Sequence, residues 1–222
     1  MKRMILIDGN SLMYRAYFGI ADTSTLKPNS KGVFTNAIMS FARMMNHILQ
    51  EQFDNILVAF DAGKHTFRHD IMTDYKAGRA HMPEEMRMQI AHIKNLLDLL
   101  GVKRYEVALY EADDIIGTMA KKAEGEGYHV DIYSSDKDLL QLITDNTTVH
   151  LTKKGLTDLE DYTPSHFEEV YGIKVPQFID LKALMGDKSD NISGVPGIGI
   201  KKAVKYLCEY KSVEGILENI LS

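Results

Sequence analysis

Short apolar runs alternate with amphipathic segments through the first three quarters of the chain, and this rhythm limits the fold more than any other feature. Strands are expected at about residues 4–8, 55–60, 102–107, 129–134 and 147–151. Apolar residues at helical spacing predict helices at about residues 33–50, 84–100 and 112–123. The alternation predicts an α/β fold with a mostly parallel central sheet flanked by helices on both faces.

Two segments depart from this rhythm. Residues 62–83 are polar, mixed in charge and weakly periodic, which predicts a long functional excursion from the sheet edge. From Thr163 onward the pattern is helical, with helices expected near 164–171, 176–185 and 200–209. We therefore expect a core over residues 1–162 with an arch inserted near 62–90, and a helical region over 163–222. The apolar ending leaves open whether the chain is cut from a longer protein.

The composition is that of a globular protein with room for an acidic pocket. The chain of 222 residues has no apolar run of membrane-spanning length, no signal-peptide pattern and one cysteine. We therefore expect a cytoplasmic protein without a disulfide or a cysteine zinc site. It carries 31 acidic and 26 basic side chains. Without the nine acids described next, the bases outnumber the acids, and such a surface suits a polyanionic partner.

Carboxylates stand where apolar runs end and where a helix or a hairpin begins. The nine residues in such positions are Asp8, Asp61, Glu111, Asp113, Asp114, Asp136, Asp138, Asp187 and Asp190. Because the carboxyl ends of parallel strands meet at one edge of a sheet, we expect these side chains to converge there. Such a cluster repels itself, so several of its pKa values should be raised unless cations neutralise it.

The ligand chemistry of this set points to hydrolysis of phosphodiesters. An all-oxygen set favours magnesium or manganese over zinc or copper. Two ions about 4 Å apart activate a water and stabilise the leaving oxygen. Glu111 and Asp114 share a face of the predicted helix and Asp113 lies about 100° around it, so at least two of the three can face one pocket. Each motif alone also has an ordinary interpretation as a helix first turn, an N-cap or an Asx turn.

A glycine-rich turn precedes the last predicted helix. Gly194 to Gly199 permit sharp turns and a close approach of the backbone, and Lys201 and Lys202 follow in the first turn of the helix. The free N–H groups and the positive dipole end of such a helix can bind the phosphates of a nucleic-acid backbone. Such contacts do not depend on the base sequence. The pattern predicts a helix–hairpin–helix, with an ordinary turn between two helices as the alternative.

The excursion carries two cations three residues apart, Lys76 and Arg79. One helical turn would present both on one side, where either could stabilise charge on a transferring phosphate. A solvated surface helix is the alternative interpretation.

Seven motifs occur together in the order and spacing of a known family. They are Ile7–Ser11, Phe60–Asp61, Tyr75–Arg79, Tyr110–Gly117, Ser135–Leu139, Gly186–Ile192 and Gly194–Ala203. The series resembles the 5′-nuclease domains of bacterial DNA polymerases I, which belong to the flap endonuclease superfamily, over almost the whole chain. The resemblance implies a PIN-like α/β core with a helical arch and a C-terminal helix–hairpin–helix region.

The resemblance also implies an activity and its partners. It implies a structure-selective 5′-3′ exonuclease and flap endonuclease of DNA replication and repair that uses two or more Mg²⁺ or Mn²⁺ ions. The expected partners are DNA with a 5′ flap or a 5′ end and RNA primer–DNA junctions, with no membrane and a monomeric state. Whether the chain is free-standing or fused to a polymerase domain stays open.

Individual site residues follow from the same resemblance. The catalytic acids that match direct metal ligands are Asp8, Asp61, Glu111, Asp113, Asp136 and Asp138. Asp114, Asp187 and Asp190 complete the acidic set. Lys76 and Arg79 match arch residues that contact the scissile phosphate. Main-chain carbonyls that match a potassium site belong to Leu184, Met185, Ser193, Val195 and Ile198. DNA backbone contacts are expected from Gly197, Ile198, Gly199, Ile200, Lys201 and Lys202.

Three other functions compete with this hypothesis. A non-catalytic helix–hairpin–helix module would bind DNA but has no need of nine convergent acids. A PIN-like ribonuclease would lack the hairpin and would prefer plain RNA. A phosphatase with Asp8 as a covalent nucleophile normally carries a second Asp two residues on, where this chain has Asn10.

Overall fold

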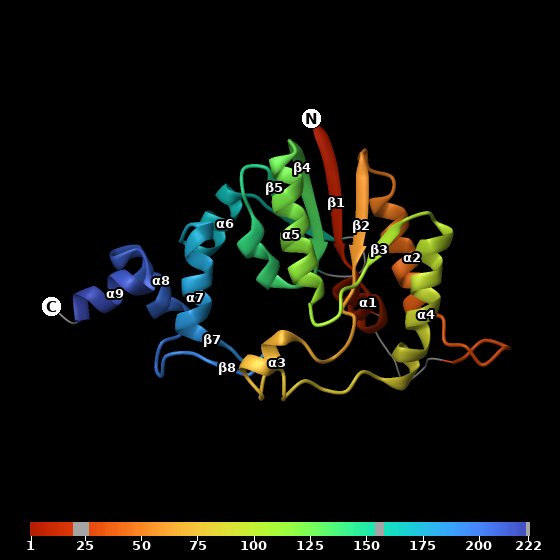
Figure 1. Ribbon diagram of the computed structural model, residues 1–222, viewed down its shortest axis with the longest axis horizontal. Helices are drawn as coiled ribbons and strands as arrows, with labels where there is room; N and C mark the ends of the chain where they lie inside the picture. The colour runs from red at the N-terminus through yellow and green to blue at the C-terminus, as the bar shows by residue number, and fades with distance from the viewer. Residues whose placement is uncertain (20–26, 154–157, 221–222) are drawn as a thin grey trace.

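The computed structural model describes residues 1–19, 27–153 and 158–220 (Figure 1). Its main sheet has the strand order β3-β2-β1-β4-β5-β6. The strands are β1 (Lys2–Asp8), β2 (Asn55–Ala59), β3 (Lys103–Tyr105), β4 (Tyr128–Ser134), β5 (Thr147–Thr152) and β6 (Leu159–Tyr162). All neighbours pair in parallel except β5 and β6, which are antiparallel. The expectation of a mostly parallel sheet is confirmed.

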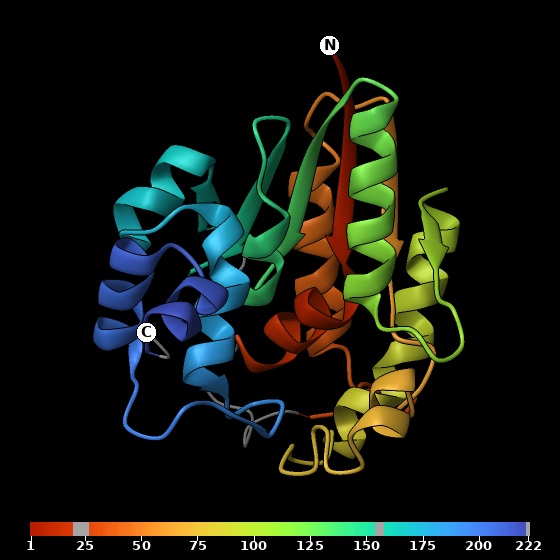
Figure 2. The same ribbon diagram turned by 60° about the vertical axis from the view of Figure 1, so that its left-hand side comes forward.

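Helices cover both faces of this sheet because β1 is apolar on both sides. Ile5 and Ile7 face α1 (Gly9–Phe18), α2 (Asn36–Ile48) and α4 (Glu84–Leu99) in one core. Met4 and Leu6 face the other core, which includes α5 (Ala112–Gly125). Figure 2 shows α5 on the near side of the sheet and α2 behind it. A strand buried on both faces is expected in the middle of a parallel sheet.

Helix α1 and strand β6 were not predicted from the sequence. Helix α1 begins directly after β1, with Asp8 as its N-cap accepting the N–H of Ser11 at 2.9 Å. Gly9 permits this abrupt start, because a Cβ there would lie 2.6 Å from ring atoms of Phe60. Strand β6 escaped prediction because it has four residues, LEDY, with little apolar alternation.

The excursion lies beyond the carboxyl edge of the sheet, whereas the C-terminal helices lie beside the sheet, on the side of β5 and β6 (Figure 1). The excursion contains one short helix, α3 (Phe67–Ile71), followed by turns at residues 73–78 and by irregular structure up to Pro83. The C-terminal elements are α6 (Pro164–Tyr171), η3 (Val175–Gln177), α7 (Phe178–Met185), β7 (Gly186–Asp187), β8 (Ile192–Ser193), α8 (Ile200–Tyr210) and α9 (Val213–Ile220). In Figure 1 the β7–β8 hairpin lies beside α3. Each helix that the sequence predicts is present, and its ends lie within three residues of the expected ones.

Across the described residues, no helix is both long and apolar enough to cross a bilayer.

Candidate active site

Three strands deliver acidic side chains to the same edge of the sheet. Asp8 is the last residue of β1, and its register partner Ala59 ends β2 two residues before Asp61. Asp136 follows β4 and caps η2 (Lys137–Leu142), where it accepts the N–H of Asp138 at 2.8 Å. Since β2, β1 and β4 are neighbours in the sheet, their carboxyl ends place these acids side by side.

Helix α5 begins at this edge and brings three more acids. Glu111 is its N-cap and forms a capping box with Asp114, whose carboxylate accepts the N–H of Glu111 at 2.9 Å. The carboxylate of Asp61 accepts the N–H of Ala112 at 2.7 Å, which ties the end of β2 to the start of the helix. Asp113 is turned toward the strand ends, where it interacts electrostatically with Asp8 and Asp61. Of the three acids, Asp113 and Glu111 therefore face the other carboxylates, and Asp114 is directed elsewhere.

Four acids form the centre of the cluster, and we call them the inner acids: Asp8, Asp61, Asp113 and Asp136. Burial, followed by the nearby charges of the other acids, raises the pKa of Asp113 to about 8. Burial also raises the pKa of Asp8 to about 6, although hydrogen bonds from Ser11 and Ser134 oppose the shift. In the part of the chain that the structure describes, none of the four forms a salt bridge. The inner acids are thus a site of uncompensated negative charge.

The other five acids, which we call the outer acids, each have a cation of the chain against them. Lys76 lies 2.8 Å from Glu111, and Arg79 lies 2.5 Å from Asp190. The two remaining cations are Arg68, which binds both oxygens of Asp114 at 2.8 Å, and Lys182, which bridges Asp138 and Asp187.

The balance between burial and these cationic partners decides the pKa values of three outer acids. Burial disfavours the charged form of Asp114, but the hydrogen bonds of Arg68 outweigh it and hold the pKa below its ordinary value. Burial likewise opposes ionisation of Asp187, yet Lys182 and Ser189 hold its pKa below the usual range. For Asp138, burial prevails over Lys182, so the pKa is raised. The outer acids are therefore largely compensated, in contrast to the inner acids.

A divalent cation fits the chemistry of the inner acids. Within the described ranges, no three acidic, histidine or cysteine side chains surround a single point closely enough to hold an ion as they stand. The donor set nevertheless consists of carboxylate oxygens, which Mg²⁺ and Mn²⁺ prefer. A bound cation would also favour the charged forms of Asp8 and Asp113, whose pKa values are raised by burial and by the neighbouring acids. Burial, charge and ligand type therefore agree with a divalent cation at this place.

The two cations of the excursion point into this acidic region, but not from a helix. Lys76 has a positive φ of 58°, and residues 72–79 form successive turns, so they do not form the helical turn that would present both cations on one side. The backbone N–H of Lys76 donates to the carbonyl oxygen of Asp190 at 3.0 Å. The guanidinium of Arg79 also donates to the carbonyl oxygen of Ser189 at 3.3 Å. These bonds to the 187–191 segment aim both cations at the acids without helical geometry.

Four polar residues that hold the site together were not identified from the sequence. The hydroxyl of Tyr75 donates to Asp190 at 3.0 Å and to Glu111 at 3.3 Å. The hydroxyl of Ser134 donates to Asp8 at 2.8 Å and accepts the N–H of Asp136 at 2.9 Å. The amide of Asn10 donates to Asp61, and Arg68 holds Asp114. Tyr75, Ser134 and Asn10 stand in or next to the recognised motifs, and that position was the only available signal.

The hairpin after α7 has the close backbone approach that its glycines predict. A Cβ at Gly186 would lie 2.2 Å from the backbone nitrogen of Gly194. Of the five predicted potassium ligands, the carbonyls of Leu184 and Val195 already accept the N–H groups of Val195 and Ile198, at 2.9 and 3.1 Å. Met185 and Ser193 lie on the two arms of the hairpin, at the end of α7 and in β8.

Helix α8 begins after this hairpin with its first turn exposed. Its N-cap is Gly199, which has no side chain to satisfy the first N–H groups. Ile200, Lys201 and Lys202 are exposed in the first turn. The ammonium of Lys202 donates to the carbonyl oxygen of Gly197 at 3.0 Å. The turn therefore presents backbone donors and two positive charges to solvent.

The parallel sheet, its acidic carboxyl edge, the cationic excursion and the hairpin together define a chain of the 5′-nuclease class. Residues 3–172 match the family model described as the 5′-3′ exonuclease N-terminal resolvase-like domain. Residues 173–222 match the 5′-3′ exonuclease C-terminal SAM fold. The chain belongs to the 5′-3′ exonuclease family, whose members are hydrolytic nucleases.

Curated proteins similar to this chain include bacterial DNA polymerases I. The chain is 53% identical over 220 residues to DNA polymerase I of Bacillus subtilis, covering 99% of this chain and 24% of that protein. It is 50% identical over 220 residues to DNA polymerase I of Streptococcus pneumoniae, covering 99% of this chain and 25% of that one. The chain thus spans about a quarter of the length of these relatives. The resemblance inferred from the seven motifs is confirmed.

Solved structures agree with the fold. The D15 protein of bacteriophage T5, crystallised with metal ions, superposes with a TM-score of 0.75 at 26% identity, covering 98% of this chain and 79% of that one. Flap endonuclease-1 from Methanococcus jannaschii has a TM-score of 0.63 at 21% identity, covering 99% of this chain and 73% of that one, and shares the fold. The predicted PIN-like 5′-nuclease fold is confirmed.

Proposed function

We propose that this chain hydrolyses phosphodiester bonds at 5′ ends and 5′ flaps of DNA with the help of two Mg²⁺ or Mn²⁺ ions. The observation that carries the proposal is the set of four inner acids, which gather at the carboxyl edge of the sheet without a compensating cation. Membership of a nuclease family and a metal-binding relative of the same fold support it. RNA primer–DNA junctions are proposed as further substrates, and a monomer as the working form.

The acids divide naturally between the two ions. The inner acids and Glu111 would hold one ion, and Asp138 with Asp187 and Asp190 would hold the other; Asp114 supports the site through its capping box with Glu111. When bound, the ions supply an activated water and stabilise the charge of the leaving oxygen. Lys76 and Arg79 neutralise acids in the protein without substrate, and a phosphate group offers both cations a new anion at the same place.

The C-terminal region would hold the duplex on one side of this site. Backbone N–H groups and lysines at residues 197–202 would contact DNA phosphates without reading bases. Potassium on the carbonyls of residues 184, 185, 193, 195 and 198 is proposed to stiffen the hairpin. We also propose that residues 1–162 with the arch near 62–90 and residues 163–222 act as two units in a cytoplasmic protein, fused to a polymerase as in the relatives.

Cleavage of a labelled 5′-flap duplex with and without Mg²⁺ tests the proposed function. We expect cleavage near the flap junction with Mg²⁺ or Mn²⁺ and none in EDTA, with product lengths read on a denaturing gel. Binding without cleavage in Mg²⁺ would support a non-catalytic helix–hairpin–helix module. Faster cleavage of plain RNA than of the flap would support a PIN-like ribonuclease.

Replacing Lys202 by Ala should weaken binding to DNA about equally for all sequences. Removing one phosphate contact lowers affinity roughly threefold to tenfold at moderate salt and reduces the salt slope by about one. Fluorescence anisotropy with two flap duplexes of unrelated sequence, at several salt concentrations in Ca²⁺ or EDTA, measures this change. Lys121→Ala, an exposed charge in the second half of α5, is the control and should bind as the wild type does. A loss confined to one of the two sequences would contradict a backbone contact.

A further inference from the structure

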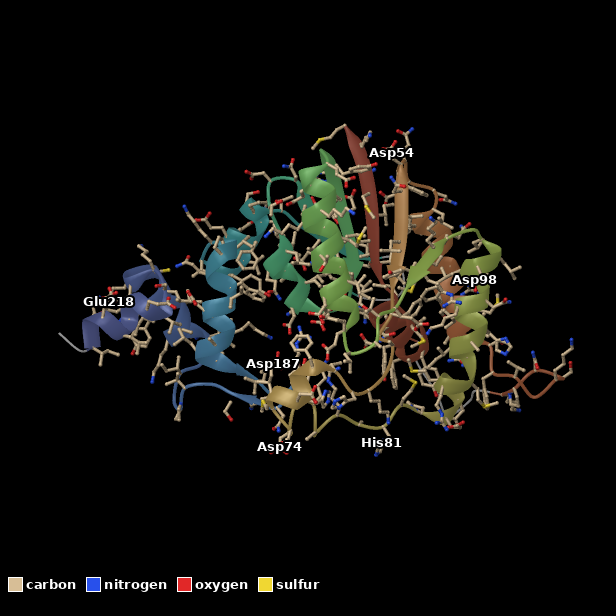
Figure 3. All side chains as sticks on the ribbon, in the orientation of Figure 1. Asp54, Asp74, His81, Asp98, Asp187 and Glu218 are labelled. Atoms are coloured by element: carbon tan, nitrogen blue, oxygen red, sulfur yellow. The ribbon has the colours of Figure 1, made fainter. Side chains whose placement is uncertain are left out.

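Lys182 occupies a place between two acids that come from different parts of the chain. It lies in the last turn of α7, and its ammonium is 2.7 Å from Asp138 and also in contact with Asp187. Asp138 belongs to η2 of the core, whereas Asp187 belongs to the β7–β8 hairpin. Figure 3 shows Asp187 beyond the carboxyl edge of the sheet, at the opposite end from Asp54. One cation therefore joins the core acids to the hairpin acids.

The orientation of Asp187 does not depend on this lysine. Its other carboxylate oxygen accepts the N–H of Ser189 at 2.8 Å, the hydroxyl of Ser189 at 2.6 Å and the N–H of Asp190 at 3.3 Å. Helix α7 is likewise fixed without Lys182, because Phe178, Leu181 and Leu184 are buried in the core. What Lys182 adds is thus positive charge beside the carboxylate of Asp187, which is positioned without it, and beside the carboxylate of Asp138.

We propose that Lys182 is a built-in counter-cation that competes with the second divalent ion for Asp138 and Asp187. In the protein without metal, its ammonium separates two carboxylates that would otherwise repel each other. A divalent ion that enters between them must displace the ammonium. The displaced ammonium stays nearby, because the lysine side chain is attached to α7. Lys182 therefore lowers the affinity of this pair for the ion. This inference rests on the proposed two-ion function.

The same competition couples the second ion to the substrate. A phosphodiester that reaches the site brings negative charge, which gives the displaced ammonium an anion other than Asp138 or Asp187. Substrate binding should therefore raise the affinity for the second ion, and by linkage the ion should raise the affinity for the substrate equally. The coupling should be weaker in a protein that lacks the lysine charge.

Titration of the protein with Mn²⁺ by calorimetry, without DNA and at neutral pH, tests this proposal. Lys182→Met keeps most of the side-chain length and removes the charge. At a separation of about 5 Å and with partial salt screening, removing one positive charge should tighten the weaker Mn²⁺ site roughly fivefold to tenfold. In EDTA, Lys182→Met should melt at a lower temperature than the wild type, because Asp138 and Asp187 then face each other without a cation.

Two further variants separate charge from structure. Lys188→Met removes an equal charge from the exposed residue next to Asp187 and should change Mn²⁺ affinity by less than about twofold, because this charge faces solvent. Lys182→Arg keeps the charge and should bind Mn²⁺ within about twofold of the wild type. Arginine gives a second test if the Met variant folds only with metal.

The outcomes distinguish the two proposals. If the wild type binds no Mn²⁺, the two-ion function fails. If it binds Mn²⁺ but Lys182→Met binds equally or more weakly, the function stands and the counter-cation role is overturned. Tightening by Lys182→Arg as large as that by Lys182→Met would also overturn it, because the charge would not be the cause.

Discussion

Asp113→Asn should abolish cleavage and at the same time stabilise the metal-free protein at pH 8. Loss of a ligand oxygen and a negative charge from the inner acids should reduce the single-turnover rate in Mg²⁺ by about 10³-fold or more. The stabilisation arises because Asp113 is buried among Asp8, Asp61 and Asp136 with no cation against it. An amide of the same shape removes the charge that these neighbours repel.

The pH dependence of this stabilisation has a definite sign. The pKa of Asp113 is raised from 3.8 to about 8 in the folded protein. The protonated carboxyl therefore contributes its full stability only below about pH 4, and that stability is lost as the pH rises through about 8. Because Asn does not titrate, the gain from Asp113→Asn should be largest at pH 8, on the order of 3 kcal/mol, and should shrink steadily toward pH 4.

Thermal unfolding in EDTA over this pH range measures the effect. A gain on the order of 3 kcal/mol corresponds to an increase in Tm of roughly 6–12 °C for a chain of this size. Asp145→Asn, an exposed carboxylate in the loop before β5, is the control and should leave Tm unchanged at every pH. In saturating Mg²⁺ the advantage of Asp113→Asn should disappear, because the wild-type cluster is then neutralised. Equal Tm values for wild type and variant in EDTA at pH 8 would show that the inner acids are not under electrostatic strain.

The sequence was sufficient for the sheet but only partly for the site. Apolar runs and the parallel-sheet rule predicted that Asp8, Asp61 and Asp136 would share an edge, because strand ends follow from local pattern. Helix α1 was missed since its start depends on a tertiary contact, the approach of Gly9 to Phe60, which no local pattern shows.

The division between inner and outer acids could not be predicted. It depends on cations that are distant in sequence, such as Arg68 against Asp114 and Lys76 against Glu111, separated by 46 and 35 residues. Spacing on a helix placed Glu111 and Asp114 on one face and predicted only that at least two of the three acids could face one pocket. The capping box uses Asp114 for the backbone and leaves Asp113 facing the cluster. Residue types and spacing predict which groups meet, whereas the pairing of charges requires the packed structure.

Lys76→Met should have the opposite effect on stability from Asp113→Asn while also slowing the chemistry. The ammonium of Lys76 is the cationic partner of Glu111, which is buried and also accepts the hydroxyl of Tyr75. Removing one partner of a largely buried pair leaves a charge poorly compensated, so the metal-free protein should lose about 1–3 kcal/mol. If Lys76 also contacts the scissile phosphate, the single-turnover rate should fall by about 10²–10³-fold.

Single-turnover cleavage of the flap duplex with enzyme in excess separates these contributions. The rate constant at saturating enzyme reports chemistry, and the enzyme concentration at half-maximal rate reports binding, which Lys76→Met should weaken far less. Lys64→Met, an exposed lysine of the same excursion, is the matched control and should cleave at the wild-type rate. An unchanged rate constant in Lys76→Met, together with the predicted loss of Tm, would restrict Lys76 to neutralising Glu111. A reduced rate constant would indicate that the charge of Lys76 acts on the phosphate. Weaker metal binding would not explain the reduction, because Glu111 without its cation attracts the metal ion more strongly.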